Sequence, residues 1–82
     1  MITNARSERV MIAAGHWLKH IRKYNCMTQR AMAATLSCNL NSYGSWELGR
    51  AMIPIQVFMY LCERYMLSPI EEMARIFCEA KI

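Results

Sequence analysis

The chain has 82 residues, enough for one small domain, because chains divide at roughly 100–200 residues per domain. A catalytic cleft between two domains is therefore excluded. The composition is 55% hydrophobic with only 3 Gly and 2 Pro, whereas disordered segments and linkers are polar. We therefore expect a folded domain that has more apolar surface than one small core can bury.

The charges divide unevenly along the chain, and the formal net charge is +4. Residues 1–50 carry seven cationic and two anionic side chains, whereas residues 51–82 carry three and four. A basic first part and a nearly neutral, apolar second part indicate a polyanionic partner on one side and a protein partner on the other.

The four cysteines, at positions 26, 38, 62 and 78, lie too far apart for a zinc knuckle or a redox motif. Their apolar neighbours predict free thiols packed as small hydrophobic residues in a reducing compartment. We expect no metal site and no cofactor. The chain opens with polar residues and contains no apolar run of about 20 residues, so we expect no secretory signal, no membrane span and a cytoplasmic protein.

Apolar residues recur at steps of three and four along most of the chain, which predicts an all-α fold with residues 1–82 as a single domain of five helices. The first helix is expected from about Asn4 or Ala5 to Tyr24. Its core-facing residues are expected to be Val10, Ala13, Ala14, Trp17, Leu18, Ile21 and Tyr24. Its solvated residues are expected to be His16, Lys19, His20 and Lys23. The two histidines have a metal-binding spacing but no third ligand in the sequence.

Two short helices follow. Thr28 can cap a second helix that runs from Gln29 to Leu36, and Asn39 can cap a third that begins at Leu40 and ends near Leu48. Gly49 then suits the left-handed conformation that closes a helix.

The last two predicted helices are strongly apolar. The fourth begins with Pro54 and continues to about Met66. Apolar residues occupy nearly its whole circumference, which predicts burial on most sides or a partial role in a subunit contact. Ser68, Pro69 and Glu71 form a capping box that starts a fifth helix ending near residue 78 or 79. Its expected buried positions are Ile70, Met73, Ala74, Phe77 and Cys78.

The second and third predicted helices, joined by the turn Ser37-Cys38-Asn39, have the order of a helix-turn-helix. The residues that stand together in one register are Met27-Thr28-Gln29, Met32-Ala33, Leu36, Ser45-Trp46-Glu47-Leu48-Gly49-Arg50 and Pro54. This pattern resembles the Cro and lambda-repressor type of DNA-binding domain, the XRE family, and the resemblance extends from about Trp17 to Met73. It implies a compact lambda-repressor-like fold with a central helix-turn-helix at about residues 28–48. The family usually has glycine where this chain has Ser37, and a branched aliphatic residue where it has Tyr43.

In a helix-turn-helix, the second helix lies in the DNA major groove while the first crosses the phosphate backbone. By matching positions, the residues that would face base edges are Leu40, Asn41, Gly44 and Ser45. Asn41 is the candidate for direct readout, because an amide can donate to and accept from the edge of one adenine. Gly44 costs a helix about 0.5–1 kcal/mol relative to Ala. Its presence indicates either close approach of the helix backbone to DNA or avoidance of a clash with a neighbouring helix.

A second set would contact the phosphate backbone and add affinity without sequence information. Its members are Thr28, Gln29, Arg30, Asn39, Ser42 and Arg50. Gln29 stands where free N–H groups at a helix start and a side-chain amide can hold a phosphate. Thr28 also fits a plain N-cap, and Arg30 also fits a solvated charge.

Arg22 and Glu47 are expected to form an internal ion pair between the first and third helices, on the grounds of family resemblance and geometry. Arg22 then supports the reading helix and is no DNA ligand. Trp46 is expected in the core rather than stacked on a base.

The resemblance implies a sequence-specific transcriptional regulator that binds double-stranded DNA as a homodimer on a palindromic operator. Family members of this size are commonly repressors of phages, plasmids or small bacterial operons, which implies a bacterial or phage-encoded protein associated with the nucleoid. The chain has no room for a ligand-sensing domain, so we expect no small-molecule substrate and control by protein concentration or another regulatory protein. The apolar second part of the chain places the dimer contact on the fourth and fifth predicted helices, with Met66, Met73, Phe77 and Ile82 as the candidate residues.

The alternative is an antitoxin or adaptor that retains the helix-turn-helix fold as a protein-interaction module. Eight methionines suit an adaptable contact surface. An enzyme is not expected, because the chain has no Asp, no metal cluster and no nucleophile beside a base.

Overall fold

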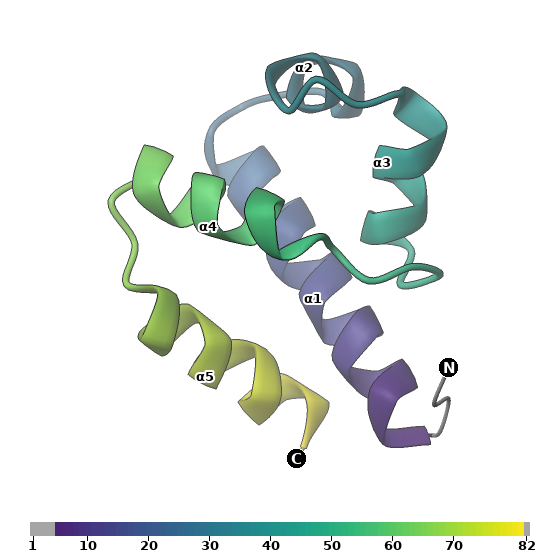
Figure 1. Ribbon diagram of the computed structural model, residues 1–82, viewed down its shortest axis with the longest axis vertical. Helices are drawn as coiled ribbons and strands as arrows, with labels where there is room; N and C mark the ends of the chain where they lie inside the picture. Colours follow the sequence, from purple (N-terminus) through teal and green to yellow (C-terminus); the bar gives the residue numbers. More distant parts are fainter. Residues whose placement is uncertain (1–4, 82) are drawn as a thin grey trace.

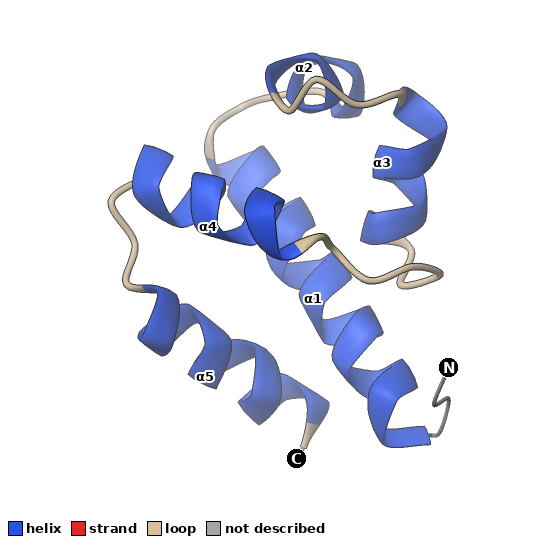
Figure 2. Cartoon of the chain, in the orientation of Figure 1, coloured by secondary structure: helices blue, strands red, loops and turns tan. Residues whose placement is uncertain are grey.

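The computed structural model describes residues 5–81, and within them it contains five α-helices and no strand (Figure 2). The helices are α1 (Ala5–Tyr24), α2 (Gln29–Thr35), α3 (Leu40–Glu47), α4 (Ile55–Arg64) and α5 (Pro69–Ala80). The predicted all-α class is confirmed, and each predicted helix boundary lies within two residues of the observed one.

The long helix α1 is the centre of the fold (Figure 1). It packs against α3 and α5, while α2 lies beyond its C-terminal end and α4 crosses in front of it. The buried residues of α1 include Ala14, Leu18 and Ile21, on the face predicted for the core. The short pair α2 and α3 is thus attached to a helix that the remaining helices hold in place.

The core combines side chains from all five helices and from the loop before α4. Its buried members are Ala13, Ala14, Trp17, Leu18, Ile21, Met32, Ala33, Tyr43, Trp46, Ile53, Phe58, Leu61, Cys62, Ile76 and Ala80. Tyr24, predicted for the core, is instead 80% exposed. It is the last residue of α1, and its ring stacks on His20 at a centroid distance of 6.3 Å.

Side chains cap three of the helices as the sequence predicts. Thr28, Asn39 and Ser68 each accept a hydrogen bond from the backbone N–H three residues later. Such caps satisfy N–H groups that have no partner within the helix. Pro54, predicted as the first residue of the fourth helix, instead precedes it, because its backbone is extended with ψ at 143°.

The first four helices end at residues in the left-handed conformation. Cys26, Ser37, Gly49 and Met66 have φ values of 56°, 55°, 74° and 58°. After each, the next N–H donates to the carbonyl five residues earlier, which is the Schellman pattern. Three of these four positions carry a side chain, although only glycine adopts this conformation without a steric cost.

The prediction that the fourth helix is buried on most sides is wrong. Only Phe58, Leu61 and Cys62 of α4 are buried. Ile55 and Met59 are 60% and 48% exposed, because α4 packs on the rest of the molecule through one face only.

The predicted buried face of the fifth helix is also wrong. The buried residues of α5 are Glu72, Ile76 and Ala80. Of the predicted positions, Met73 is half-buried and the others, Ile70, Ala74, Phe77 and Cys78, are exposed. Polar contacts with α1 orient the helix this way: the indole N–H of Trp17 donates to Glu72 over 2.8 Å, and Arg9 donates to the carbonyl of Ala80 over 3.0 Å.

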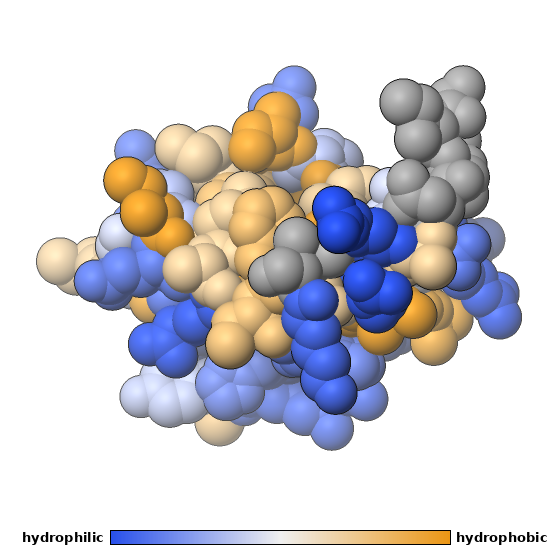
Figure 3. Space-filling model, turned by 90° about the horizontal axis from the view of Figure 1, so that it is seen from below, coloured by the Kyte–Doolittle hydropathy of each residue, from blue (hydrophilic) through white to orange (hydrophobic). Residues whose placement is uncertain are grey.

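The outward apolar stripes of α4 and α5 form an open groove of about 440 Å³, here called the α4–α5 groove. Its lining is Ile55, Phe58, Met59, Pro69, Ile70, Met73, Ala74 and Phe77. Figure 3 shows apolar side chains gathered in the middle of the molecule's lower face, with hydrophilic side chains around them. This surface accounts for the excess of apolar residues in the second part of the chain.

The cysteines do not all follow the prediction of packed thiols. All four are free; Cys62 is buried and Cys38 half-buried, whereas Cys26 and Cys78 are exposed. Burial raises the pKa of the Cys62 and Cys38 thiols. In the described part of the chain, no helix combines the length and the apolar character needed to cross a membrane.

Replacement of Ser37 by glycine should stabilise the protein. The left-handed conformation costs a non-glycine residue about 1–2 kcal/mol, part of which glycine loses again through its freer unfolded chain. We expect Ser37→Gly to raise the free energy of unfolding by about 0.5–1 kcal/mol in urea titrations. The matched control is Ala34→Gly, which should lower it by a similar amount because Ala34 is a right-handed residue of α2. Changes in the free energy of unfolding that have the same sign in the two variants would contradict this explanation.

Candidate nucleic-acid interface

Helix α3 has a buried face and an exposed face, and the contacts of the buried face determine its position. Tyr43, Trp46 and Glu47 are buried against the rest of the domain. Gly15 of α1 allows this close approach, since a Cβ atom there would lie 2.5 Å from the carbonyl oxygen of Trp46. The backbones of α1 and α3 therefore touch, which leaves little freedom in how α3 is placed.

The predicted ion pair between Arg22 and Glu47 is confirmed. The guanidinium Nε of Arg22 lies 2.7 Å from one carboxylate oxygen of Glu47, and a terminal nitrogen lies 3.1 Å from the other. Arg22 also donates to the carbonyl of Met27 over 2.9 Å. Both charged residues are buried, with exposures of 9% and 7%. Such a two-point contact fixes orientation as well as distance.

Two further side chains bind the same carboxylate, and sequence reasoning missed both contacts. The amide nitrogen of Gln29, at the start of α2, donates to Glu47 over 3.0 Å. The hydroxyl of Tyr43, one turn earlier in α3, also donates to it. Glu47 thus connects α1, α2 and α3. A Gln or a Tyr side chain can bind many different partners, so no rule of sequence spacing identifies Glu47 as the partner of Gln29 and Tyr43.

The hydrogen bonds decide the ionisation of this cluster. Burial alone would raise the pKa of Glu47, but the hydrogen bonds from Arg22, Tyr43 and Gln29 outweigh it and hold that pKa below its ordinary value. The hydrogen bond with Glu47 raises the pKa of Arg22. Burial and the neighbouring carboxylate raise the pKa of Tyr43. At neutral pH the cluster is a charged carboxylate held by a guanidinium, a phenol and an amide.

The four residues predicted to face bases lie together on the outer face of α3. Leu40 is 37% exposed, Asn41 is exposed, and Gly44 and Ser45 are partly exposed. The Ser45 hydroxyl donates to the carbonyl of Asn41 over 3.0 Å. The side-chain amide of Asn41 makes no hydrogen bond to any residue of 5–81, so its donor and acceptor are available to a ligand.

Gly44 does not serve to avoid a neighbouring helix. A Cβ atom built on Gly44 would have no atom of another part of the protein within 4 Å. The clash explanation is therefore wrong, and the space beside the α3 backbone is open. A glycine that weakens a short helix without relieving any internal contact is consistent with an external molecule that approaches this backbone closely.

The residues predicted to contact phosphates lie around α2 and at both ends of α3. Thr28 and Asn39 are N-caps, so their side-chain oxygens are already used, while Ser42 is half-buried. Arg30 and Arg50 are exposed and have no ion-pair partner among residues 5–81. The side-chain nitrogen of Gln29 donates one of its two N–H groups to Glu47, which leaves the other N–H for the predicted phosphate contact.

The predicted dimer residues do not form one cluster. Met73 and Phe77 line the α4–α5 groove, and Phe77 is 41% exposed. Met66, in the turn between α4 and α5, is 92% exposed. Ile82 lies outside the described residues.

The comparisons with known proteins give no relative for this chain: no family model, curated protein or solved structure matches it.

Loss of the Glu47 charge should destabilise the domain strongly. Glu47→Gln leaves the buried guanidinium of Arg22 without its counter-charge, so we expect the free energy of unfolding at neutral pH to fall by about 3–5 kcal/mol. The measurement is urea unfolding followed by circular dichroism. Glu63→Gln, at an exposed position of α4, is the control and should change stability by less than about 0.5 kcal/mol.

The same variant gives a test in acid. Because the pKa of Glu47 is lowered in the folded state, its contribution to stability is full above the unfolded pKa and is lost as the pH falls through the folded pKa. The difference in unfolding free energy between the parent and Glu47→Gln should therefore shrink at a pH below about 4.3, the ordinary Glu value. A difference that stays constant down to pH 2 would contradict this assignment.

Proposed function

We propose that this protein is a sequence-specific DNA-binding transcriptional regulator of the Cro and lambda-repressor type that reads the major groove with α3. The observation that carries the proposal is the outer face of α3: an unbonded Asn41 amide beside a glycine with open space around it. The opposite face of the same helix is fixed by Glu47 and Gly15. A rigid helix with an uncommitted polar face is what direct readout of base edges requires.

The surroundings of α3 supply the contacts that this mode of binding needs. The starts of α2 and α3 present backbone N–H groups, which favour anions. Arg30 and Arg50 add two exposed positive charges near these helices. In this proposal Arg30, Arg50 and Gln29 hold the phosphates on either side of the groove, while Leu40, Asn41, Gly44 and Ser45 meet the bases.

We propose further that the regulator acts as a homodimer, with the α4–α5 groove as the contact. The groove is lined almost entirely by apolar side chains, and exposed apolar patches mark many protein–protein contacts. A twofold pair of recognition helices about 34 Å apart would match a palindromic operator. Sedimentation as a monomer at tens of micromolar protein would count against this contact.

A second function is favoured by that same surface. If the groove binds a different protein, the chain is an antitoxin or an adaptor that retains the fold. The two functions differ in their response to salt. DNA binding weakens steeply as salt rises because counterions are released from neutralised phosphates, whereas binding through an apolar groove does not.

Removal of the Asn41 amide tests direct readout. On a duplex selected from a random pool, Asn41→Ala should weaken binding by roughly 1–3 kcal/mol, with little effect on unselected DNA. Gln29→Ala should weaken binding to both DNAs because it removes a phosphate contact. The measurement is fluorescence anisotropy at several salt concentrations. An equal loss on both DNAs for Asn41→Ala would remove it from the base-reading set.

A methyl group at Gly44 should have opposite effects on stability and on DNA binding. Gly44→Ala should stabilise the domain by about 0.5–1 kcal/mol, since open space surrounds the position and Ala favours the helix. It should also weaken binding to the selected duplex, because the methyl group occupies the space next to the DNA. Gly15→Ala is the matched control and should destabilise the fold by about 1–3 kcal/mol or more, since its Cβ meets the α3 backbone. Unchanged DNA affinity for Gly44→Ala would argue against close approach.

A further inference from the structure

The outer face of α3 carries a narrow set of chemical groups. Helix α3 contains one charged residue, Glu47, and its carboxylate is buried and hydrogen-bonded within the domain. No guanidinium, ammonium or free carboxylate therefore projects from this helix. Its outer face offers the amide of Asn41, the hydroxyl of Ser45 and the side chain of Leu40, which is 37% exposed.

The groups at the start of α3 match one kind of base pair in the major groove. An amide matches adenine, which presents an acceptor at N7 beside a donor at N6, and an apolar side chain matches the methyl group of thymine. Guanine presents two acceptors and is read by Arg or Lys, whereas cytosine presents a donor and is read by Asp or Glu. Asn41 and Leu40 thus suit the two bases of A·T pairs, and α3 has no free charged group that would read a G·C pair.

The Ser45 hydroxyl adds no contact to guanine. Its hydrogen is donated to the carbonyl of Asn41 over 3.0 Å, so the oxygen is left as an acceptor. An acceptor can bind the amino group of adenine or of cytosine, but not O6 or N7 of guanine. Selection for A·T pairs therefore falls to the first two residues of α3, Leu40 and Asn41.

The nearby cationic side chains begin outside α3. Arg50 follows the helix, whose eight residues extend about 12 Å, and base contacts come from the N-terminal residues of a reading helix. Arg30 belongs to α2, the helix that would cross the phosphate backbone. These positions suit phosphates on either side of the groove. They add affinity without a preference for guanine.

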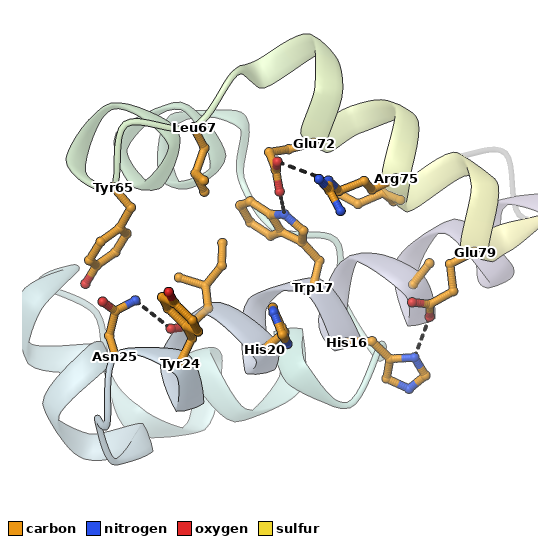
Figure 4. A pocket seen from close by; sticks show the side chains of 13 residues that line it. His16, Trp17, His20, Tyr24, Asn25, Tyr65, Leu67, Glu72, Arg75 and Glu79 are labelled. Atoms are coloured by element: carbon orange, nitrogen blue, oxygen red, sulfur yellow. Dashed lines mark hydrogen bonds and ion pairs between the residues drawn. The ribbon is translucent and has the colours of Figure 1, made fainter.

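The cleft between α1 and α5 is a poor surface for DNA (Figure 4). Its lining includes the carboxylates of Glu72 and Glu79 and the guanidinium of Arg75. Two acidic groups against one basic group disfavour a polyanion. The outer face of α3 is thus the better place for contacts with base edges.

We propose that the start of α3 reads two neighbouring A·T pairs in each half-site of the target, an assignment that rests on the proposed function. Asn41 binds an adenine through N6 and N7, and Leu40 contacts the methyl group of a thymine in the neighbouring pair. Leu40 is then a specificity-determining residue, which accounts for an exposed apolar side chain in the first turn of a reading helix.

Base analogues that remove one group each test the two contacts separately. A duplex enriched from a random pool by the full chain is labelled with fluorescein. Its thymines are replaced by deoxyuridine and its adenines by 7-deazaadenine, one position at a time. Both replacements keep the base pair, while the first removes only the methyl group and the second only the N7 acceptor. Affinities are measured by fluorescence anisotropy at one fixed salt concentration.

In each half-site we expect one thymine at which deoxyuridine weakens binding about threefold to fivefold, as the loss of one buried methyl group implies. In the neighbouring pair, 7-deazaadenine should weaken binding about threefold to tenfold, as the loss of one hydrogen bond implies. The first loss should disappear in Leu40→Ala and the second in Asn41→Ala, because each variant lacks the partner group. Leu48→Ala, which truncates a 64% exposed leucine after the end of α3, is the matched control and should keep both losses.

The outcomes separate this assignment from the proposed function. An enriched duplex in which no replacement of thymine or adenine weakens binding would overturn the assignment alone. Losses that persist unchanged in Leu40→Ala or in Asn41→Ala would do the same for the contact concerned. A random pool from which the protein enriches no sequence would overturn the proposed function itself.

Discussion

The arrangement of the first three helices depends on the hydrogen bonds to the carboxylate of Glu47. A buried charge is tolerated only when partners replace its water, and here Arg22, Gln29 and Tyr43 do so from three helices. The shape of the domain follows from this requirement: α1, α2 and α3 must meet where one carboxylate can accept from all of them. The apolar core then closes around that point, with Tyr43 fully buried.

The central helix α1 transmits this constraint to both sides of the molecule. On one side Gly15 brings its backbone against α3. On the other, Trp17 donates to Glu72 and turns the polar side of α5 inward. The second contact has a cost, since it leaves the longest apolar stripe of α5 outside. The same helix therefore produces a rigid outer face on α3 and an apolar groove beside α4.

Much of this fold could be predicted from local chemistry, since Thr28, Asn39 and Ser68 mark helix starts by rules that need only neighbouring residues. The ion pair of Arg22 with Glu47 followed from a motif. The remaining partners of Glu47 could not be predicted, because they meet only after three helices have packed. The buried face of α5 was predicted wrongly for a physical reason: periodicity ranks faces by apolar content, whereas Glu72 is buried because the Trp17 indole, distant in the sequence, satisfies it.

In the proposed DNA-binding function, the low charge of α3 gives the α4–α5 groove a role. The only charged residue within α3 is Glu47, and it is buried, so base contacts from Asn41 and its neighbours would come without electrostatic attraction. Affinity must then come from the flanking charges of Arg30 and Arg50 and from the helix starts, and each neutralised phosphate contributes only a modest, salt-dependent gain. Two linked copies double these contacts and make the second binding event effectively intramolecular. Under the proposed function, a domain with so few free charges near α3 would need a second copy to hold one site on DNA, and the unpaired apolar stripes of α4 and α5 would be the surface available to join it.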